Sequence, residues 1–470
     1  MNSGPEHASI PDLTAAFRQK TLSPVELLQA QLGRIRAHNA EVNAFAFLDE
    51  ERALAAARAS EARWARGAPS GALDGVTFTT KDNIPVAGYP SRRGSLTTSD
   101  APMKETAPIV ARCLEAGAVL LGTTTMPEFA MGPVTLNALT GVTRNPWDTG
   151  MQTGGSSGGA AAAVAAGFCT LSIASDAGGS IRIPASLCGV AGFKPSAGRV
   201  PIYPPSVAGG LSCNGPIALR VADVALALNA ATRPDPRDPA ALPPDGVDYV
   251  AAARGGIQGW KVALSLTLGY ARKVHPEVAA AVRRAADVLA SLGAMVEERD
   301  PEVEDPTDTY LALMRGTVRY SLRSLTAAQR KLLAPGARDI LEGPEVSLAD
   351  YLGAQERSLA LARRMQAFHG SYDLLVTPAT AWPAFPAERS YPAEFEEFPN
   401  RRAWVPFGAL FNLTGQPAIS VPCGLTAQGL PIGLHLVGPR GADAKVLRAA
   451  AAHEAAAPFA ERPTIRRRTT

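Results

Sequence analysis

Two glycine- and serine-rich stretches decide the fold of this chain: Gly154-Gly155-Ser156-Ser157-Gly158-Gly159 and Asp176-Ala177-Gly178-Gly179-Ser180-Ile181-Arg182. The alanine-rich run 160–168 between them predicts a buried helix, because Ala packs closely and loses no side-chain entropy. A glycine turn that opens a helix presents backbone N–H groups to an anion or oxyanion. The helix argues against a flexible Gly/Ser linker, and no Gly-Lys-Ser/Thr follows to make a phosphate-binding loop.

A lysine upstream is a candidate base for these serines. A serine hydroxyl needs a base to become nucleophilic, and lysine can serve only when it is neutral. Lys81 follows the apolar, β-branched run 75–80, which predicts a strand that enters the core. Burial there would lower the pKa of the lysine and favour the neutral amine. A solvated lysine at a strand end is the alternative for Lys81 considered alone.

The second stretch has the composition of an oxyanion hole. Gly178 and Gly179 lack Cβ atoms, so consecutive backbone N–H groups can converge on one point beside Ser180. Asp176 and Arg182 carry opposite charges on either side and can pair or hold the turn through hydrogen bonds. A simple glycine-rich turn is the alternative for this stretch considered alone.

The first stretch also matches the G-x-S-x-G pattern of an α/β-hydrolase, with Ser156 as the nucleophile. That class requires a catalytic histidine late in the chain, and the candidates are His369, His435 and His453. His435 lies in the predicted strand 432–437, where a structural role is expected, and the other two lie in predicted helices. No histidine partner for Ser156 emerges, so we favour the lysine as the base.

In order and spacing, Lys81, Ser156 and Ser180 resemble the catalytic residues of the amidase signature family, which hydrolyses amides through a Ser, cis-Ser, Lys triad. Other segments that resemble the family include Lys81-Asp82-Asn83, Gly122-Thr123-Thr124-Thr125, Arg144-Asn145-Pro146-Trp147, Gly192-Phe193-Lys194-Pro195 and Phe411-Asn412-Leu413-Thr414. The resemblance extends from about residue 23 to about residue 454 and is weakest between about 235 and 372.

The resemblance implies a role for each of these residues. Ser180 would be the acylated nucleophile, Ser156 the bridging serine after a cis peptide bond, and Lys81 the terminal base. The backbone N–H groups that would hold the oxyanion belong to Ala177, Gly178, Gly179 and Ser180. The residues that would orient the triad are Ser157, Asp176 and Arg182. Ala177 and Ala197 depart from the residues that are common in the family at or near their positions, which leaves the substrate open.

Strand patterns alternate with helix patterns along the chain. Ser23, Pro24 and Glu26 form a capping-box signature for a helix that runs to about His38. Further helices are predicted at 51–66, 107–116 and 275–292, and strands at 119–122, 262–266, 294–297, 373–377, 418–422 and 433–437. This alternation predicts an α/β fold, a single large domain with a mixed, mainly parallel central β-sheet covered by helices on both faces.

We expect residues 1–470 to form one domain with a core at about 23–230 and 373–454. The region of about 235–372 is expected to vary and to shape the substrate site. The segment 384–404 mixes aromatics, prolines and charges and is expected to be lid-like. Its aromatic residues Phe385, Tyr391, Phe395 and Trp404 would line an entrance, with a solvated loop as the alternative. The candidate pocket residues are Met126, Phe129, Met131, Phe385 and Trp404.

The composition is that of an ordinary globular protein: 470 residues, 46% hydrophobic, 19% charged, with a net charge of +3. This charge does not indicate a nucleic-acid partner. The longest apolar run, 160–174, is interrupted by polar residues and too short to span a bilayer, and no signal peptide is recognised at the start. The five cysteines form no C-x-x-C pair, which is typical of reduced thiols in the cytoplasm, and we expect no metal or cofactor.

Three functions remain open from the sequence. The favoured one is a free-standing amidase, a monomer or homodimer that cleaves small to medium apolar or aryl amides, with carbamates (urethanes) and esters as further substrates. The second is the glutaminase subunit of a tRNA-dependent amidotransferase, which works with a partner protein. It is less favoured because no arginine for the carboxylate of glutamine can be placed around 357–364. A catalytically silent binding protein is the third, and the presence of all three triad residues speaks against it.

Overall fold

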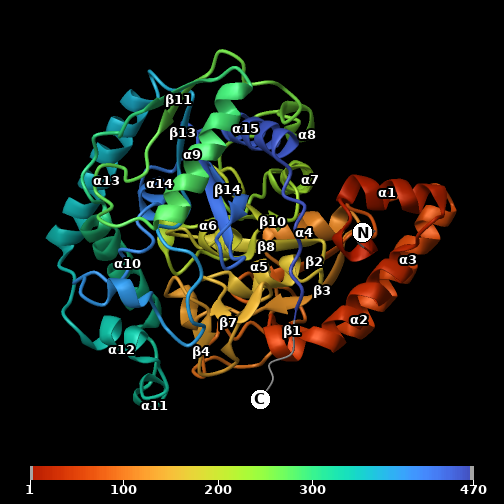
Figure 1. Ribbon diagram of the computed structural model, residues 1–470. Coiled ribbons are helices and arrows are strands. Elements are labelled where there is room, and N and C mark those ends of the chain that lie inside the picture. The colour runs from red at the N-terminus through yellow and green to blue at the C-terminus, as the bar shows by residue number, and fades with distance from the viewer. Residues whose placement is uncertain (1–3, 466–470) are drawn as a thin grey trace.

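One eleven-stranded sheet runs through the protein in the order β1-β3-β2-β8-β10-β9-β14-β15-β13-β11-β12 (Figure 1). The computed structural model describes residues 4–465. The strands of the sheet are β1 (Phe45–Leu48), β2 (Thr77–Lys81), β3 (Val119–Thr124), β8 (Leu171–Asp176), β9 (Ala191–Lys194), β10 (Cys213–Ala218), β11 (Lys261–Leu264), β12 (Met295–Glu298), β13 (Leu374–Pro378), β14 (Ala418–Leu425) and β15 (Pro431–Val437). Two small ladders pair β4 (Leu136–Asn137) with β5 (Gly141–Val142), and β6 (Arg144–Asn145) with β7 (Asp148–Gln152).

The predicted mixed sheet is confirmed, and its parallel pairing is gathered into two wings. Strands β3, β2 and β8 pair in parallel in one wing, and β13, β11 and β12 do so in the other. The strands between the wings, β10, β9, β14 and β15, pair antiparallel. One cause is local: the short connection 426–430 folds β14 and β15 into a hairpin, which requires antiparallel strands.

The α-helices are α1 (Ile10–Gln19), α2 (Pro24–Val42), α3 (Glu50–Ala65), α4 (Pro108–Glu115), α5 (Gly158–Ala165), α6 (Arg182–Cys188), α7 (Val221–Ala231), α8 (Tyr249–Ala252), α9 (Pro276–Ser291), α10 (Thr307–Leu322), α11 (Ala327–Arg330), α12 (Pro335–Glu342), α13 (Leu348–Phe368), α14 (Ala409–Leu413) and α15 (Asp443–Ala456). The predicted capping box is present at the start of α2. Ser23 Oγ accepts from the Glu26 N–H, and the Glu26 carboxylate accepts from the Ser23 N–H.

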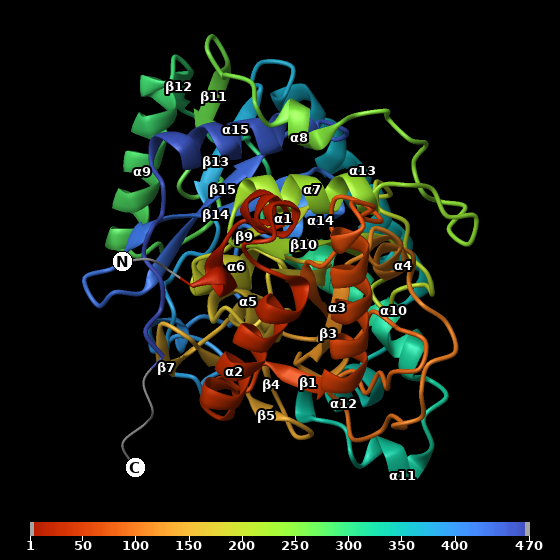
Figure 2. The same cartoon turned by 90° about the vertical axis from the view of Figure 1, so that its right-hand side faces the viewer.

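Helices cover both faces of the sheet, as predicted (Figures 1 and 2). On one face, α4, α7, α9 and α15 pack over alternate strand residues such as Phe78, Ile173 and Leu436. On the other face, α5 and α6 are buried in the middle of the molecule, and α10, α13 and α14 pack over the wing that contains Leu375. Every residue of the alanine-rich α5 is buried, which confirms the predicted buried helix.

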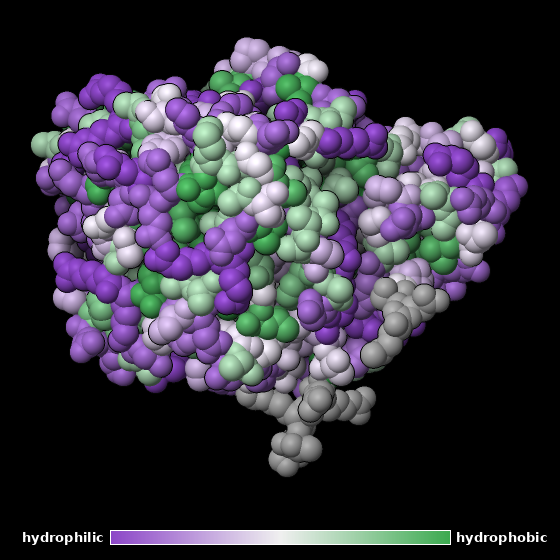
Figure 3. All heavy atoms as spheres, turned by 45° about the horizontal axis from the view of Figure 1, so that its top comes forward, coloured by the Kyte–Doolittle hydropathy of each residue, from purple (hydrophilic) through white to green (hydrophobic). Residues whose placement is uncertain are grey.

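The helices α1, α2 and α3 stand at one side of the molecule, next to β1 and β3 (Figure 1). The surface turned forward in Figure 3 is mainly hydrophilic, with apolar residues in separate patches. Among residues 4–465, no helix combines the length and the apolar character that a membrane crossing would need.

Candidate active site

Two parallel strands end in charged residues at the same edge of the sheet. Lys81 is the last residue of β2, and Asp176 is the last residue of β8. These strands pair in parallel, so their carboxyl ends lie together. Of the two glycine-rich stretches, 154–159 joins β7 to α5, and 176–182 joins β8 to α6. The local chain path therefore brings segments that are distant in sequence to one place.

The amine of Lys81 lies against a serine in the buried interior. Its Nζ is 2.6 Å from Ser156 Oγ and 3.1 Å from Ser175 Oγ. Lys81 and Ser156 are 0% and 1% exposed, and the peptide bond between Gly155 and Ser156 is cis. Burial lowers the pKa of Lys81 to about 7, although the charge of Asp176 opposes the shift. The neutral amine is therefore accessible near neutral pH, and it has a serine hydroxyl within proton-transfer distance.

Ser180 lies in the turn between β8 and α6, beside the turn that carries Ser156. Its carbonyl accepts a hydrogen bond from the Ser157 N–H at 3.2 Å. Ser157 Oγ donates to the carbonyl of Ser175 at 3.1 Å, so Ser157 ties the two turns together. Ser180 also lines a large cleft together with Gly155 and Gly178, and it is less buried than Ser156. The cleft therefore opens onto Ser180 and not onto the more deeply buried Ser156.

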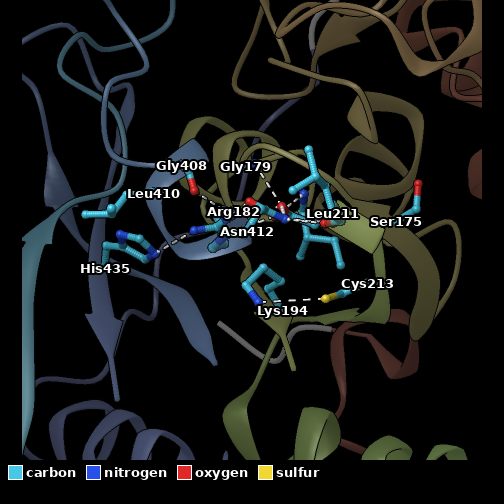
Figure 4. A network of polar contacts seen from close by, with 12 residues as sticks. Ser175, Gly179, Arg182, Lys194, Leu211, Cys213, Gly408, Leu410, Asn412 and His435 are labelled. Atoms are coloured by element: carbon cyan, nitrogen blue, oxygen red, sulfur yellow. Dashed lines mark hydrogen bonds and ion pairs between the residues drawn. The ribbon is translucent and has the colours of Figure 1, made fainter. Parts of the chain in front are cut away.

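A buried ion pair holds the second turn in shape (Figure 4). The Arg182 guanidinium donates from Nε and Nη2 to the two oxygens of Asp176, both at 2.9 Å. The same carboxylate accepts from the N–H groups of Gly179 and Ile181 at 2.8 and 3.0 Å. Burial alone would raise the pKa of Asp176, but Arg182 and these hydrogen bonds lower it well below its usual value. Asp176 is thus a fixed negative charge at the base of the turn.

The four predicted oxyanion donors differ in their hydrogen bonding. The N–H of Gly179 is engaged by Asp176, whereas those of Ala177, Gly178 and Ser180 donate to no other residue in the described range 4–465. Gly179 has a φ of 112°, which side chains rarely adopt, and a Cβ on Gly178 would lie 2.4 Å from Tyr310 Oη. The glycines therefore permit a backbone path that leaves three donors available.

Three polar residues of the site are not marked as functional by the sequence analysis. Ser175 Oγ contacts both Lys81 and the Asn83 amide, which donates to it at 3.1 Å. Asn412, from α14, donates to the Asp176 carboxylate and accepts from Arg182 Nη2 at 2.7 Å. Asn83 and Asn412 lie inside the quoted family segments, which is the signal that could have found them. Ser175 directly precedes Asp176 on a buried strand, and nothing in its sequence marks it.

The late histidines lie away from the serines. His435 contacts Arg182 Nη1 at 3.3 Å and Thr377 Oγ1 at 3.1 Å, and burial lowers its pKa well below the usual value. His369 Nδ1 contacts the carbonyl of Tyr372, and His453 is buried in α15. In residues 4–465, none of the three has a hydrogen bond with Ser156 or Ser180. His435 is hydrogen-bonded within the core, as expected for a structural residue, and among residues 4–465 these three histidines form no triad with the two serines.

The cleft beside Ser180 has a volume of about 1410 Å³. Its apolar lining includes Met131, Leu136, Ile183, Leu311, Met314, Val318, Leu332, Leu333 and Ile340, and its charged residues are Glu128, Arg315, Asp339, Glu342 and Arg402. Glu128 is not free, since its carboxylate accepts from Ser95 Oγ and from the Ala334 N–H. Much of this lining comes from α10, α12 and the connection between them, and the segment 127–138 supplies another part. The cleft is therefore suited to a largely apolar substrate.

Of the five side chains predicted for the pocket, Met131 lines the cleft and the others do not. Met126 is 0% exposed, and Phe129 packs against α10 and α12. Phe385 and Trp404 pack edge to face, with ring centroids 4.9 Å apart, in a buried cluster that includes Ile183. Phe385 and Trp404 therefore belong to the core beside the cleft, because these large aromatic side chains find apolar partners in the interior.

The comparisons with known proteins agree with this geometry. The family model described as Amidase matches residues 26–447. The chain is 36% identical over 460 residues to a glutamyl-tRNA(Gln) amidotransferase subunit of Chloroflexus aggregans, covering 92% of this chain and 93% of the relative. It is 34% identical over 479 residues to an acylamidase of Rhodococcus erythropolis, covering 97% of this chain and 96% of the relative.

A solved structure of a bacterial aryl acylamidase of the amidase signature family superimposes with a TM-score of 0.90. It has 30% sequence identity to this chain, and the match covers 97% of both chains. The fold, the length of the matches and the family model all indicate the same family. The chain belongs to the amidase signature family and is an amidase, a hydrolase of amide carbon–nitrogen bonds.

Proposed function

We propose that this protein is a free-standing amidase that works through an acyl-enzyme on Ser180. The observation that carries the proposal is the 2.6 Å contact between Lys81 Nζ and Ser156 Oγ, in a buried setting that makes the neutral amine accessible near pH 7. A neutral amine can take a proton from Ser156, which can in turn take one from Ser180. In a catalytically silent binding protein, the unfavourable burial of Lys81 would have no function.

The reaction begins when Ser180 Oγ attacks the amide carbonyl and its proton moves through Ser156 to Lys81. The N–H groups of Ala177, Gly178 and Ser180 stabilise the oxyanion, and each such donor contributes roughly 10²–10³-fold in rate. The proton then returns to the leaving amine as the carbon–nitrogen bond breaks. Water, activated by the same relay, hydrolyses the acyl-enzyme to the acid and regenerates Ser180.

The substrates are small to medium apolar or aryl amides, with carbamates (urethanes) and esters reacting through the same acyl-enzyme. The apolar lining of the cleft supports this class. So does the similarity to a protein described as an aryl acylamidase. The region 235–372 shapes the site, since α10, α12 and the connection between them supply much of the cleft wall. Within the segment 384–404, Arg402 is the residue that reaches the cleft.

Substrate profiling with a matched pair of serine variants tests the proposal. The panel contains anilides, primary amides, aryl carbamates and glutamine, each with the wild type, Ser180→Ala and Ser371→Ala. Ser371 is exposed and far in sequence from the site, so its variant controls for the loss of a hydroxyl. We expect anilide or carbamate turnover in the wild type and the control, and none with Ser180→Ala. Equal turnover by both variants would refute the role of Ser180.

The glutaminase subunit of an amidotransferase is the second candidate, favoured by identity to proteins of that description. Against it, Arg357 on α13 donates to Thr309 Oγ1, and neither Arg357 nor Arg364 lines the cleft. A glutamine carboxylate would have to use Arg315 or Arg402 instead. Release of ammonia from glutamine only when a partner protein is added would favour this second function.

We further propose that residues 1–470 act as one unit with the core and variable regions defined above. The protein would work in the cytoplasm as a monomer or homodimer, without nucleic acid, membrane, metal or cofactor. Five free cysteines support the cytoplasmic assignment, because disulfides are rare in that compartment.

A further inference from the structure

A second pocket, of about 40 Å³, shares no lining residue with the cleft, although Phe129 on its wall is the chain neighbour of Glu128 and Ala130 in the cleft. Its polar lining consists of Asn83, Arg93, Tyr203, Ser206, Ser212 and Asn214. These residues come from the segment after β2, from the loop before β10 and from β10 itself. We call this cavity the Arg93 pocket.

Arg93 brings a positive charge to this pocket, and the nearby Asp82 carboxylate acts on it without forming an ion pair. Within residues 4–465, its guanidinium has no hydrogen bond and no ion pair. Burial lowers the pKa of Arg93, and the charge of Asp82 opposes the shift. The Asp82 carboxylate itself accepts from the N–H groups of Arg92 and Gly94. Arg93 is half-buried, and its guanidinium stays charged, so an anion that reaches it in the pocket gains charge-assisted hydrogen bonds.

The Arg93 pocket connects to Lys81 through two side chains. Asn83, on the pocket wall, donates to Ser175 Oγ at 3.1 Å, and Ser175 Oγ lies 3.1 Å from Lys81 Nζ. Asn214, on another wall, lies opposite Ser175 in the antiparallel register of β10 and β8. A ligand in the Arg93 pocket would therefore lie next to Asn83, which is linked to Lys81 through Ser175.

We propose that the Arg93 pocket binds a small carboxylate. The guanidinium of Arg93 offers charge-assisted hydrogen bonds, and the amides of Asn83 and Asn214 and the hydroxyls of Ser206 and Ser212 are neutral donors on the same walls. A buried water needs about 10–15 Å³ by this measure, so the cavity holds roughly three non-hydrogen atoms, the size of a carboxylate group.

The proposed function gives such a ligand a source, because amide hydrolysis releases a carboxylic acid. The identification of the ligand with a reaction product rests on the proposed function, whereas the binding site itself does not. Because Asn83 and Ser175 join the pocket to Lys81, a bound carboxylate is expected to reduce kcat rather than to raise KM. A carboxylate that instead enters the cleft would compete with the substrate and raise KM.

Calorimetric titration of the full-length protein with sodium acetate, at constant ionic strength, tests the site without requiring turnover. We expect one saturable site in the wild type and at least about tenfold weaker binding in Arg93→Gln, since a hydrogen bond to a charged group contributes about 1.5–3 kcal/mol. Arg58→Gln, which removes the same charge from an exposed position on α3, should bind acetate like the wild type. Acetate affinity that is equal in Arg93→Gln and the wild type, or no saturable binding at all, overturns the proposal.

Ser206→Asp provides a second test that keeps Arg93 in place and covers the case in which Arg93→Gln does not fold. The new carboxylate should pair with Arg93 and abolish acetate binding, and unchanged binding contradicts the proposal. Inorganic phosphate is titrated in parallel as the other small oxyanion. If phosphate binds more tightly than acetate and depends on Arg93, the pocket is a phosphate site and the carboxylate assignment fails. An inactive protein that still binds acetate through Arg93 separates this inference from the proposed function.

Discussion

Lys81 combines two properties that seldom occur in one lysine: it is fully buried, and its amine lies 2.6 Å from a serine hydroxyl rather than from a carboxylate. Burial of the charged form accounts for its lowered pKa, and Asp176 opposes the shift without reaching hydrogen-bond distance in the described structure. A carboxylate in direct contact would keep the amine protonated. The serine contact leaves it free to act as a base.

The pH dependence of activity follows from this setting. Below about pH 7 the amine of Lys81 is protonated and cannot accept a proton, and above it the neutral form predominates. We expect kcat/KM for an anilide to rise through about pH 7 and to level off at higher pH. A pH–rate profile between mildly acidic and alkaline conditions measures this. An acid optimum would contradict a neutral lysine as the base.

Ser156 should matter more for amides than for activated esters. In the proposed relay it passes a proton to the leaving group, and an amine leaves only after protonation, whereas a nitrophenolate leaves without it. Ser156→Ala should therefore lower kcat/KM for an anilide by about 10²–10⁴-fold, and for the matching nitrophenyl ester by clearly less. The measurement is the ratio of the two losses in one preparation. Equal losses of kcat/KM for the anilide and the ester would mean that Ser156 acts only in the attack of Ser180 on the carbonyl, or only in folding.

The Asp176–Arg182 pair predicts a loss of stability. Both side chains are buried, so removal of Arg182 leaves Asp176 as an uncompensated buried charge. We expect Arg182→Met to lower the free energy of unfolding by about 3–5 kcal/mol. Urea unfolding followed by circular dichroism measures the change. The double variant Asp176→Asn/Arg182→Met removes both charges and should recover part of the loss, and no recovery would speak against a charge-based effect.

Among the helices, strands and turns, the sequence predicts local features, but it does not predict contacts between segments that are distant along the chain. The capping box at Ser23 and the buried alanine helix depend on neighbouring residues, so the sequence predicts them. The glycine-rich turns and Lys81 are recognisable because their residue types and spacing are specific. Asn412 donates to Asp176 across 236 positions, and Ser175 gains its role from strand pairing. Such contacts depend on how distant segments meet, which local patterns do not encode.

The segment 384–404 illustrates the same limit. Its mixture of aromatics, prolines and charges is typical of a lid or a solvated loop, yet Phe385, Phe395 and Trp404 are buried among partners from other segments. A loop without long helices or strands can still form part of the core when its aromatic side chains turn inward and its charged ones remain outside. Burial of these rings is not visible from the periodicity of the sequence.

This packing predicts the effect of removing Trp404. The side chain is 0% exposed and lies against Phe385, so Trp404→Ala should lower the free energy of unfolding by about 3–5 kcal/mol. Urea unfolding again provides the measurement. Tyr320→Ala, at a 65% exposed aromatic residue on α10, is the matched control and should change stability little. A Trp404 variant that keeps full stability but changes substrate preference would restore the lid interpretation.

In the whole molecule, the sheet holds the candidate catalytic residues, and separate helices form the cleft wall. The carboxyl ends of β2 and β8 and the nearby turns hold Lys81, Ser156 and Ser180, whereas α10, α12 and the connection between them form the outer wall of the cleft. The wall belongs to the region where the resemblance to the family is weakest. We therefore expect that chemistry and substrate choice can change independently in this fold.

This separation predicts that a change in the wall alters substrate preference and leaves the chemistry intact. Met314 on α10 lines the cleft, and Met314→Ala would remove apolar surface that a long acyl chain can contact. The lost contact is worth about 1–2 kcal/mol, so we expect kcat/KM to fall about tenfold for a long-chain anilide. The value for acetanilide should stay the same, since a small acyl group does not reach the wall. Leu348→Ala, at a 74% exposed position on α13, is the control. An equal loss for both anilides would mean that α10 supports the catalytic turns, and that the wall and the sheet act as one unit.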